Sequence, residues 1–138
     1  MINNTLLTDY AIVIVSAKEN EFMAGFSADD DGEGSTRNHF KILKASNCKK
    51  IVVVVNKMDA NEINWSRAIF EDRVRHVQNF VLRLFRGVDI ASFLTFVPAS
   101  ATHGENVVHS PSKEKLYDWY DGLSVLDTLD SFNNMPML

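Results

Sequence analysis

Residues 51–59 read Ile51-Val52-Val53-Val54-Val55-Asn56-Lys57-Met58-Asp59, five β-branched residues followed by a mostly polar segment. An uninterrupted β-branched run predicts a strand whose two faces are both buried, as in parallel sheets covered by helices. In such sheets, ligands bind beyond the carboxyl ends of the strands. Residues 56–59 therefore stand where a ligand is expected.

Two further apolar runs, residues 11–16 and residues 93–97, predict the other strands. The first is expected to be buried on both faces, and Pro98 ends the second. Helical patterns alternate with the strands, which predicts right-handed crossovers between parallel strands. The expected fold class is α/β, a three-layer parallel sheet with flanking helices. Residues 18–34, rich in acid, Gly and Ser, predict an exposed loop, and a second long loop is expected at residues 99–121.

The longest predicted helix spans residues 66–85, because apolar residues recur there at alternating spacings of four and three. The residues expected to face the sheet are Phe70, Val74, Val77, Val81 and Leu84. The residues expected on its solvated face are Arg73, Arg75, Gln78 and Arg83. Shorter helices are predicted at residues 36–45, with Ser35 as N-cap, and after Ser124, which forms a capping-box pattern with Asp127.

The composition limits the class of protein. With 138 residues, 46% of them apolar and 23% charged, the chain has the size and composition of one globular domain. A formal charge of −4 argues against a general nucleic-acid binder. The apolar runs are too short to cross a bilayer, so no membrane partner is expected. The one cysteine, Cys48, cannot form an internal disulfide, and a cytoplasmic location is expected.

The polar residues after the central strand suit a guanine base. Guanine presents N1–H and a 2-amino group side by side, and the carboxylate of Asp59 can accept both hydrogen bonds. Adenine has an acceptor at N1 and no 2-amino group, so it would leave buried polar groups unpaired. Asn56 can reach the acceptor edge of the base and can also brace neighbouring loops. Lys57 can lay its methylene stem over the purine face while its ammonium stays in water.

The third predicted strand ends in a second polar loop, which contains Ser100-Ala101-Thr102. A Ser-Ala pair at that place can bring backbone N–H groups and a hydroxyl to the purine O6. Together the two loops describe a guanine pocket, with these candidate contact residues: Asn56, Lys57, Met58, Asp59, Ser100, Ala101 and Thr102. The four histidines are scattered along the chain, and neither a catalytic residue nor a metal ligand is expected.

These motifs give the sequence a family resemblance. It resembles the GTP-binding domain of the translational GTPases of the elongation factor 1-alpha type, a group that includes eukaryotic release factor 3 and the ribosome-rescue GTPase that partners Pelota. Residues 51–59 match the guanine-specificity motif, and residues 96–106 resemble the last nucleotide loop. Other matching segments are Glu21-Phe22, Ala24-Gly25-Phe26, Thr36-Arg37, His39 and Trp119-Tyr120. Ile63-Asn64-Trp65 and Gly122-Leu123 are closer to the release and rescue branches.

The resemblance implies a ligand, GTP or GDP, and partners in the full-length protein: the ribosome and a tRNA or tRNA-mimicking release or rescue factor. It also implies a P-loop-NTPase-like sheet of which this chain supplies the last three strands and helices. Residues 1–138 are therefore expected to be the C-terminal half of a GTP-binding domain. None of the six glycines precedes a lysine, so there is no G-x-x-x-x-G-K-[ST] phosphate loop. The Mg²⁺ of the complete domain is expected to find no ligands in this chain, which alone is expected not to hydrolyse GTP.

Two other functions stay open. A non-catalytic protein-interaction module could keep the fold without GTP hydrolysis, although it would have no physical need for the motif at residues 56–59. An unrelated Rossmann-like enzyme is the third hypothesis, and the absence of G-x-G-x-x-G argues against it. In the resembled domain, the strand at residues 11–16 pairs with the strand that bears the phosphate loop. Without that partner its apolar edge is expected to promote self-association, or to be covered by residues 1–7.

Overall fold

The computed structural model describes residues 10–29 and 32–133. Its strands are β1 (Tyr10–Ser16), β2 (Ala28–Asp29), β3 (Gly32–Glu33), β4 (Lys50–Asn56) and β5 (Leu94–Pro98). Its helices are α2 (Glu19–Gly25), α3 (Ser35–Ala45), α4 (Arg67–Leu84), α5 (Ile90–Phe93), α6 (Glu114–Tyr117) and α7 (Val125–Asn133). Within these ranges, no helix combines the length and the apolar character needed to cross a membrane.

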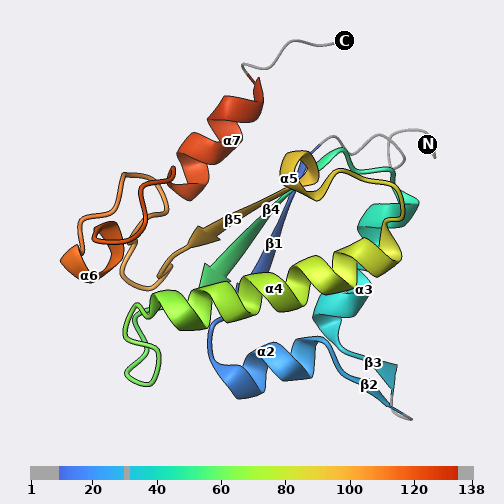
Figure 1. Ribbon diagram of the computed structural model, residues 1–138, viewed down its shortest axis with the longest axis horizontal. Coiled ribbons are helices and arrows are strands. Elements are labelled where there is room, and N and C mark those ends of the chain that lie inside the picture. Colours follow the sequence, from blue (N-terminus) through green and yellow to red (C-terminus); the bar gives the residue numbers. More distant parts are fainter. Residues whose placement is uncertain (1–9, 30–31, 134–138) are drawn as a thin grey trace.

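The main sheet contains three parallel strands in the order β1-β4-β5. The short strands β2 and β3 form a separate antiparallel hairpin. Helices α2, α3 and α4 cover one face of the main sheet, and α7 lies against the other face (Figure 1). This arrangement confirms the predicted α/β class, with a parallel sheet between two layers of helices.

Strand β4 is buried on both faces, as its sequence predicts. Ile51, Val53 and Val55 belong to the apolar cluster beneath α2, α3 and α4, whereas Val52 and Val54 pack toward α7. All five side chains are at most 6% exposed. Both neighbours of β4 are strands, so its backbone hydrogen bonds are made on both edges.

The prediction that residues 11–16 are buried on both faces is wrong for one face. Val13 and Val15 are buried under the layer of α2, α3 and α4, whereas Ile12 and Ile14 are 45% and 62% exposed. The reason is that α7 packs over β4 and, among the described residues, meets β1 at Tyr10 through Phe132. The described residues pair β1 with β4 alone, and the suggested cover from residues 1–7 lies outside them.

The predicted long helices are confirmed, with small changes at their ends. Ser66 is the N-cap of α4, and its hydroxyl accepts a hydrogen bond from the Ile69 amide at 3.3 Å. Ser124 likewise accepts from the Asp127 amide, at 3.2 Å, where α7 begins. The predicted inward residues of α4 are all buried or partly buried against the core: Phe70, Val74, Val77, Val81 and Leu84. The predicted cap Ser35 is instead the first helical residue of α3.

The segment predicted to be an exposed loop, residues 18–34, contains helix α2 and the β2–β3 hairpin. Although this segment is acidic, Phe22 anchors it in the core. Phe22 is 2% exposed, and its ring centroid lies 5.0 Å from that of Phe26. Gly34 follows the hairpin and is the N-cap of α3. A side chain at this position would overlap the carbonyl oxygens of Ala24 and Gly25, so only glycine fits there.

Two other predictions of element boundaries need correction. Phe93, predicted to begin the third strand, ends the short helix α5, and β5 begins at Leu94. The long loop predicted at residues 99–121 contains the one-turn helix α6, anchored by the fully buried Leu116. Helices of four residues are too short to show a helical period in sequence.

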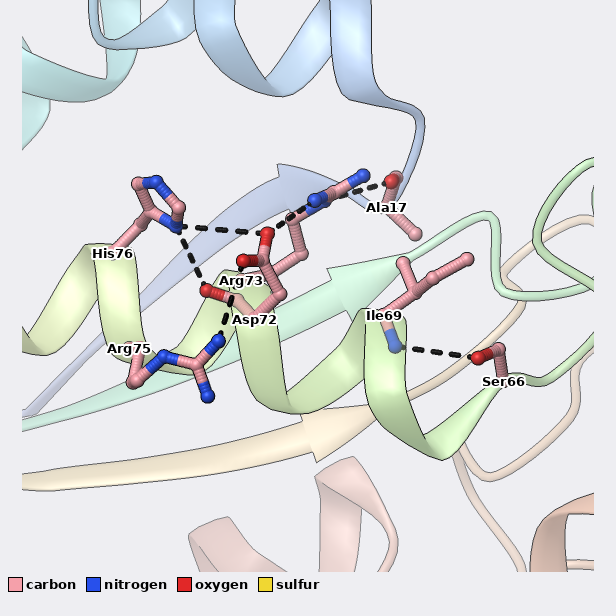
Figure 2. Close-up of polar contacts among 7 residues, drawn as sticks. All are labelled: Ala17, Ser66, Ile69, Asp72, Arg73, Arg75 and His76. Carbon is pink, nitrogen blue, oxygen red and sulfur yellow. Dashed lines mark hydrogen bonds and ion pairs between the residues drawn. The ribbon is translucent and has the colours of Figure 1, made fainter.

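Arg73 lies on the face of α4 that was predicted to be solvated, yet it is 8% exposed. Figure 2 shows why: its guanidinium lies between α4 and the end of β1, donates to the Ala17 carbonyl at 2.9 Å and pairs with Asp72 at 2.6 Å. It also stacks over the Phe22 ring, 5.4 Å from its centroid. Arg73 therefore ties α4 to the β1–α2 connection.

We expect the substitution Arg73→Ala to lower the free energy of unfolding by about 2–3 kcal/mol, because it removes a buried charge-assisted hydrogen bond and the packing of the stem. Urea denaturation followed by circular dichroism measures the change. The exposed Arg83→Ala is the matched control, with an expected change within about 0.5 kcal/mol. Equal effects of the two substitutions would contradict the assigned role of Arg73.

Candidate functional site

The loops after β4 and β5 meet at the carboxyl edge of the sheet. The pairing of the two strands ends at Val55 and Pro98, and the Ala99 amide then donates to the Val55 carbonyl at 2.9 Å. The Met58 amide donates in turn to the Ala99 carbonyl at 3.2 Å. The two polar motifs predicted from the sequence are therefore adjacent in the fold.

Asn56, the last residue of β4, joins the two loops through its side chain. Its Oδ1 accepts a hydrogen bond from the Ala101 amide at 2.9 Å. Its backbone carbonyl accepts from the Ala17 amide at 2.8 Å, on the β1 side. Asn56 thus braces three loops, which is one of the two roles its sequence position suggests.

Lys57 adopts a left-handed backbone conformation, with φ of 64°. This conformation is costly for a residue with a side chain, and such residues occur often at functional turns. The turn directs the Lys57 side chain outward, where its Nζ lies 2.9 Å and 3.1 Å from the two carboxylate oxygens of Glu21. The ammonium expected to be in water is therefore paired with α2.

Met58 differs from the other residues of its motif because its side chain has no exposed surface. It belongs to the apolar cluster beneath α4, and its carbonyl accepts from the Trp65 amide at 2.8 Å. Met58 consequently anchors the loop in the core and does not present its side chain to a ligand. Of the seven predicted contact residues, Met58 and Ser100 are the two whose side chains are fully buried.

Asp59 keeps its side chain partly accessible, at 27% exposure. Its Oδ2 lies 2.9 Å from Nε2 of His103, which belongs to the loop after β5. In the sequence, His103 is one of four scattered histidines. No local pattern could have paired it with Asp59, because the contact joins residues from two different loops.

The residues Ser100, Ala101 and Thr102 divide between the core and the surface. Ser100 is fully buried, and its Oγ lies 3.4 Å from the His103 amide. Ala101 and Thr102 are exposed at the mouth of the loop. The Asn56–Ala101 hydrogen bond therefore brings the two predicted segments together, with Ala101 and Thr102 exposed and Ser100 buried.

Glu105 supports the same loop from beneath and was missed in the sequence. Its backbone pairs with Ser100 in both directions, at 3.2 Å and 2.9 Å. Its buried carboxylate accepts three hydrogen bonds: from the Ser112 amide, the Ser112 hydroxyl and the Lys113 amide, at 2.6 Å, 2.6 Å and 2.7 Å. Burial acts to raise the pKa of Glu105, but the hydrogen bonds outweigh it and lower that pKa below its ordinary 4.5.

A surface hollow lies beside the Lys57–Glu21 pair. It has a volume of about 430 Å³ and is lined by Lys18, Glu19, Asn20, Glu21 and Glu62. Its acidic lining does not favour a phosphate. Across residues 10–29 and 32–133, no group of three or more His, Cys, Asp and Glu side chains is placed to hold a metal ion.

Comparison with known proteins places the site in context. The family described as "Elongation factor Tu GTP binding domain" matches residues 1–134 of this chain. Elongation factor 1-alpha of Hyperthermus butylicus is 36% identical over 137 residues, which are 99% of this chain and 29% of that protein. The eukaryotic peptide chain release factor GTP-binding subunit of Schizosaccharomyces pombe is 32% identical over 135 residues, which are 98% of this chain and 20% of that protein.

Solved structures agree with the sequence comparison. The structure of Sup35 complexed with GDP matches with a TM-score of 0.78 and 32% identity, over 89% of this chain and 29% of that chain. The GTPase-like domain of S. cerevisiae Ski7, bound to GDP and inorganic phosphate, has a TM-score of 0.62 over 97% of this chain and 29% of its own. Its 20% identity shows the shared fold alone. The chain thus spans less than a third of the length of each of these relatives.

The buried Glu105 makes the stability of the chain depend on pH. Its lowered pKa means that the folded chain binds fewer protons here than the unfolded chain, so its contribution is complete above about pH 4.5 and is lost as the pH falls through the lowered pKa. Glu105→Gln should lower the free energy of unfolding by about 1–3 kcal/mol at pH 7, and by progressively less as the pH falls.

Thermal unfolding of the two chains between pH 3 and pH 7 measures this difference. The exposed Glu114→Gln, in the neighbouring helix α6, is the control and should follow the wild type at every pH. A Glu105→Gln penalty that stays constant down to pH 3 would exclude the carboxylate as its source.

Proposed function

The chain belongs to the elongation factor Tu GTP-binding domain family, and from this premise we propose that it is the guanine-recognising, C-terminal half of a translational GTPase domain. The observation that carries the proposal is the meeting of residues 56–59 and residues 100–102 at one edge of the sheet, joined by the Asn56–Ala101 hydrogen bond. A base held there would lie beyond the carboxyl ends of parallel strands, where ligands of such sheets bind.

Each accessible residue has a role in the proposed pocket. The Asp59 carboxylate accepts the guanine N1–H and 2-amino group, because its oxygens have free lone pairs beside the His103 contact. The Thr102 backbone amide faces the O6 side of the base, whereas the Ala101 amide already donates to Asn56 Oδ1. The Lys57 stem covers one face of the purine. Ser100 and Met58 hold the two loops in place from the core.

The ligand class follows from the relatives. Sup35 has been solved with GDP and with GMPPNP, at 32% and 31% identity to this chain. We therefore take GDP and GTP as the ligands. The sequence has no G-x-x-x-x-G-K-[ST] loop to cradle phosphates, so in this proposal base contacts carry the binding by this chain and the binding is weak. We assign no hydrolytic residue and no Mg²⁺ ligand to this chain.

The cellular role is proposed from the same relatives, which are elongation and release factors. We propose that the full-length protein works at the ribosome, together with a tRNA or a release or rescue factor that resembles one. We also propose that it is cytoplasmic. The guanine site then serves as the part that selects the nucleotide.

A second function, a non-catalytic interaction module, is favoured by one observation. Both side chains expected to meet the base already have partners within the chain, Lys57 with Glu21 and Asp59 with His103. A module that no longer binds nucleotide could keep these pairs as surface links. The nucleotide titration described next separates the two functions.

Isothermal titration with GDP and ADP at high concentration tests the proposal. We expect weak binding of GDP and none of ADP, because adenine cannot satisfy the Asp59 carboxylate. Asp59→Asn should weaken GDP binding by about tenfold or more. The same variant should gain affinity for xanthosine diphosphate, since the amide can donate to the xanthine C2 carbonyl and accept from N1–H.

The gain for xanthosine diphosphate excludes unfolding as the cause of the GDP loss. Equal binding of GDP and ADP, or no binding of either, would contradict guanine recognition and leave the interaction module as the function of this chain.

We also propose that the edge of β1 that no described strand pairs with lets two copies of the chain associate. β1 carries no charged residue and exposes Ile12 and Ile14 next to that edge, which are properties of strands that pair between molecules. Sedimentation velocity should show dimers at high concentration, and Ile14→Lys should abolish them. The control is Leu82→Lys, an equally polar change at a half-exposed residue of α4. A wild type that stays monomeric throughout would contradict this proposal.

A further inference from the structure

Glu21 reaches the proposed base pocket from outside both nucleotide loops. It lies on α2, and its carboxylate contacts the Lys57 ammonium with both oxygens, at 2.9 Å and 3.1 Å. The two side chains are 45% and 48% exposed, so neither is needed to fill the core. The contact connects segments that are 36 residues apart in sequence.

The Glu21 carboxylate is itself fixed by the end of β1. The Ser16 hydroxyl donates to it at 2.6 Å, and that hydroxyl in turn accepts from the Lys18 amide at 3.1 Å. Ser16 pairs with Asn56 in the sheet register, directly before the Lys57 turn. The Ser16 hydroxyl and the Lys57 ammonium both lower the pKa of Glu21, so the carboxylate is charged at neutral pH.

Helix α2 gives this arrangement a firm base. Phe22, the residue after Glu21, is buried against the Phe26 and His76 rings and beneath the Arg73 guanidinium. Glu21 therefore projects from a helix that is tied to α4 and to the end of β1. The Glu21 side chain is fixed by the helix at its backbone and by Ser16 at its carboxylate. It therefore has less conformational entropy to lose when a ligand binds.

We propose that Glu21 is a positioning residue for the base pocket: it holds the Lys57 ammonium so that the methylene stem lies across the purine face. The inference rests on the proposed guanine site and adds to it a residue that lies outside both nucleotide motifs. A long lysine side chain loses considerable rotamer freedom when it is fixed in one place. When the Lys57 ammonium is paired with a fixed carboxylate, part of this rotamer freedom is already lost before the nucleotide binds.

The role through Lys57 predicts a specific pattern of affinities. The stem contacts the face of the base, whereas Asp59 reads its N1–H and 2-amino edge. Inosine diphosphate keeps the ring system and the N1–H but lacks the 2-amino group. Loss of the Glu21 carboxylate should therefore weaken the binding of GDP and of inosine diphosphate by the same factor. The ratio of the two affinities should stay unchanged.

The test is a titration of the 138-residue chain with GDP and with inosine diphosphate, followed in ¹H–¹⁵N correlation spectra. Glu21→Gln keeps the size of the side chain, and we expect it to lower the affinity for both ligands by about two- to fivefold. Glu19→Gln is the matched control, since it removes the same charge from the same helix without touching Lys57, and should leave both affinities unchanged.

A double-mutant cycle separates positioning from a general effect of charge or folding. In the Lys57→Ala background, Glu21→Gln should have no further effect on GDP affinity. An unchanged affinity in Glu21→Gln, an effect that persists without Lys57, or a changed GDP-to-inosine diphosphate ratio would each overturn the inference while leaving the guanine site intact. A wild-type chain that binds neither ligand overturns the proposed function, and this inference with it.

Discussion

The burial of β4 on both faces is the constraint on which the rest of the structure depends. Because both neighbours of β4 are strands and both faces are covered by helices, its ends have little freedom. The chain leaves the sheet after Asn56 at a fixed place, beside the end of β5. The hydrogen bond from the Ala101 amide to Asn56 Oδ1 then joins the loop after β4 to the loop after β5. The candidate site is thus a consequence of the packing of one apolar strand.

The candidate site depends on contacts between side chains of residues 56–59 and partners from other segments. Three polar residues of segment 56–59 have side chains that are not buried in the core, namely Asn56, Lys57 and Asp59, and each contacts a partner from another segment. Asn56 meets the backbone of Ala101, and Asp59 meets His103. Lys57 meets Glu21 on α2. In the proposed function, the polar motif supplies the hydrogen-bonding groups for a base, and contacts with the surrounding loops and with α2 fix the positions of these groups.

The sequence predicts the features that depend on neighbouring residues. The β-branched run of β4 and the apolar spacing of α4 are local patterns, and both elements occur where they were expected. The features that depend on long-range contacts could not be predicted. From the sequence, Arg73 is expected on the solvated face of α4, but the Ala17 carbonyl, directly after β1, and the Phe22 ring of α2 bury it. His103 and Glu105 gain their roles in the same way, from partners in other loops.

We propose above that the edge formed by residues 56–59 and 100–102 recognises guanine. Amide-resolved ¹H–¹⁵N spectra of the assigned chain, recorded with increasing GDP, test it most directly. We expect the largest shifts to fall on these two segments, and ADP at equal concentration to leave them unchanged. Shifts confined to the acidic hollow around Glu19 and Glu62, or identical shifts with both nucleotides, would contradict it.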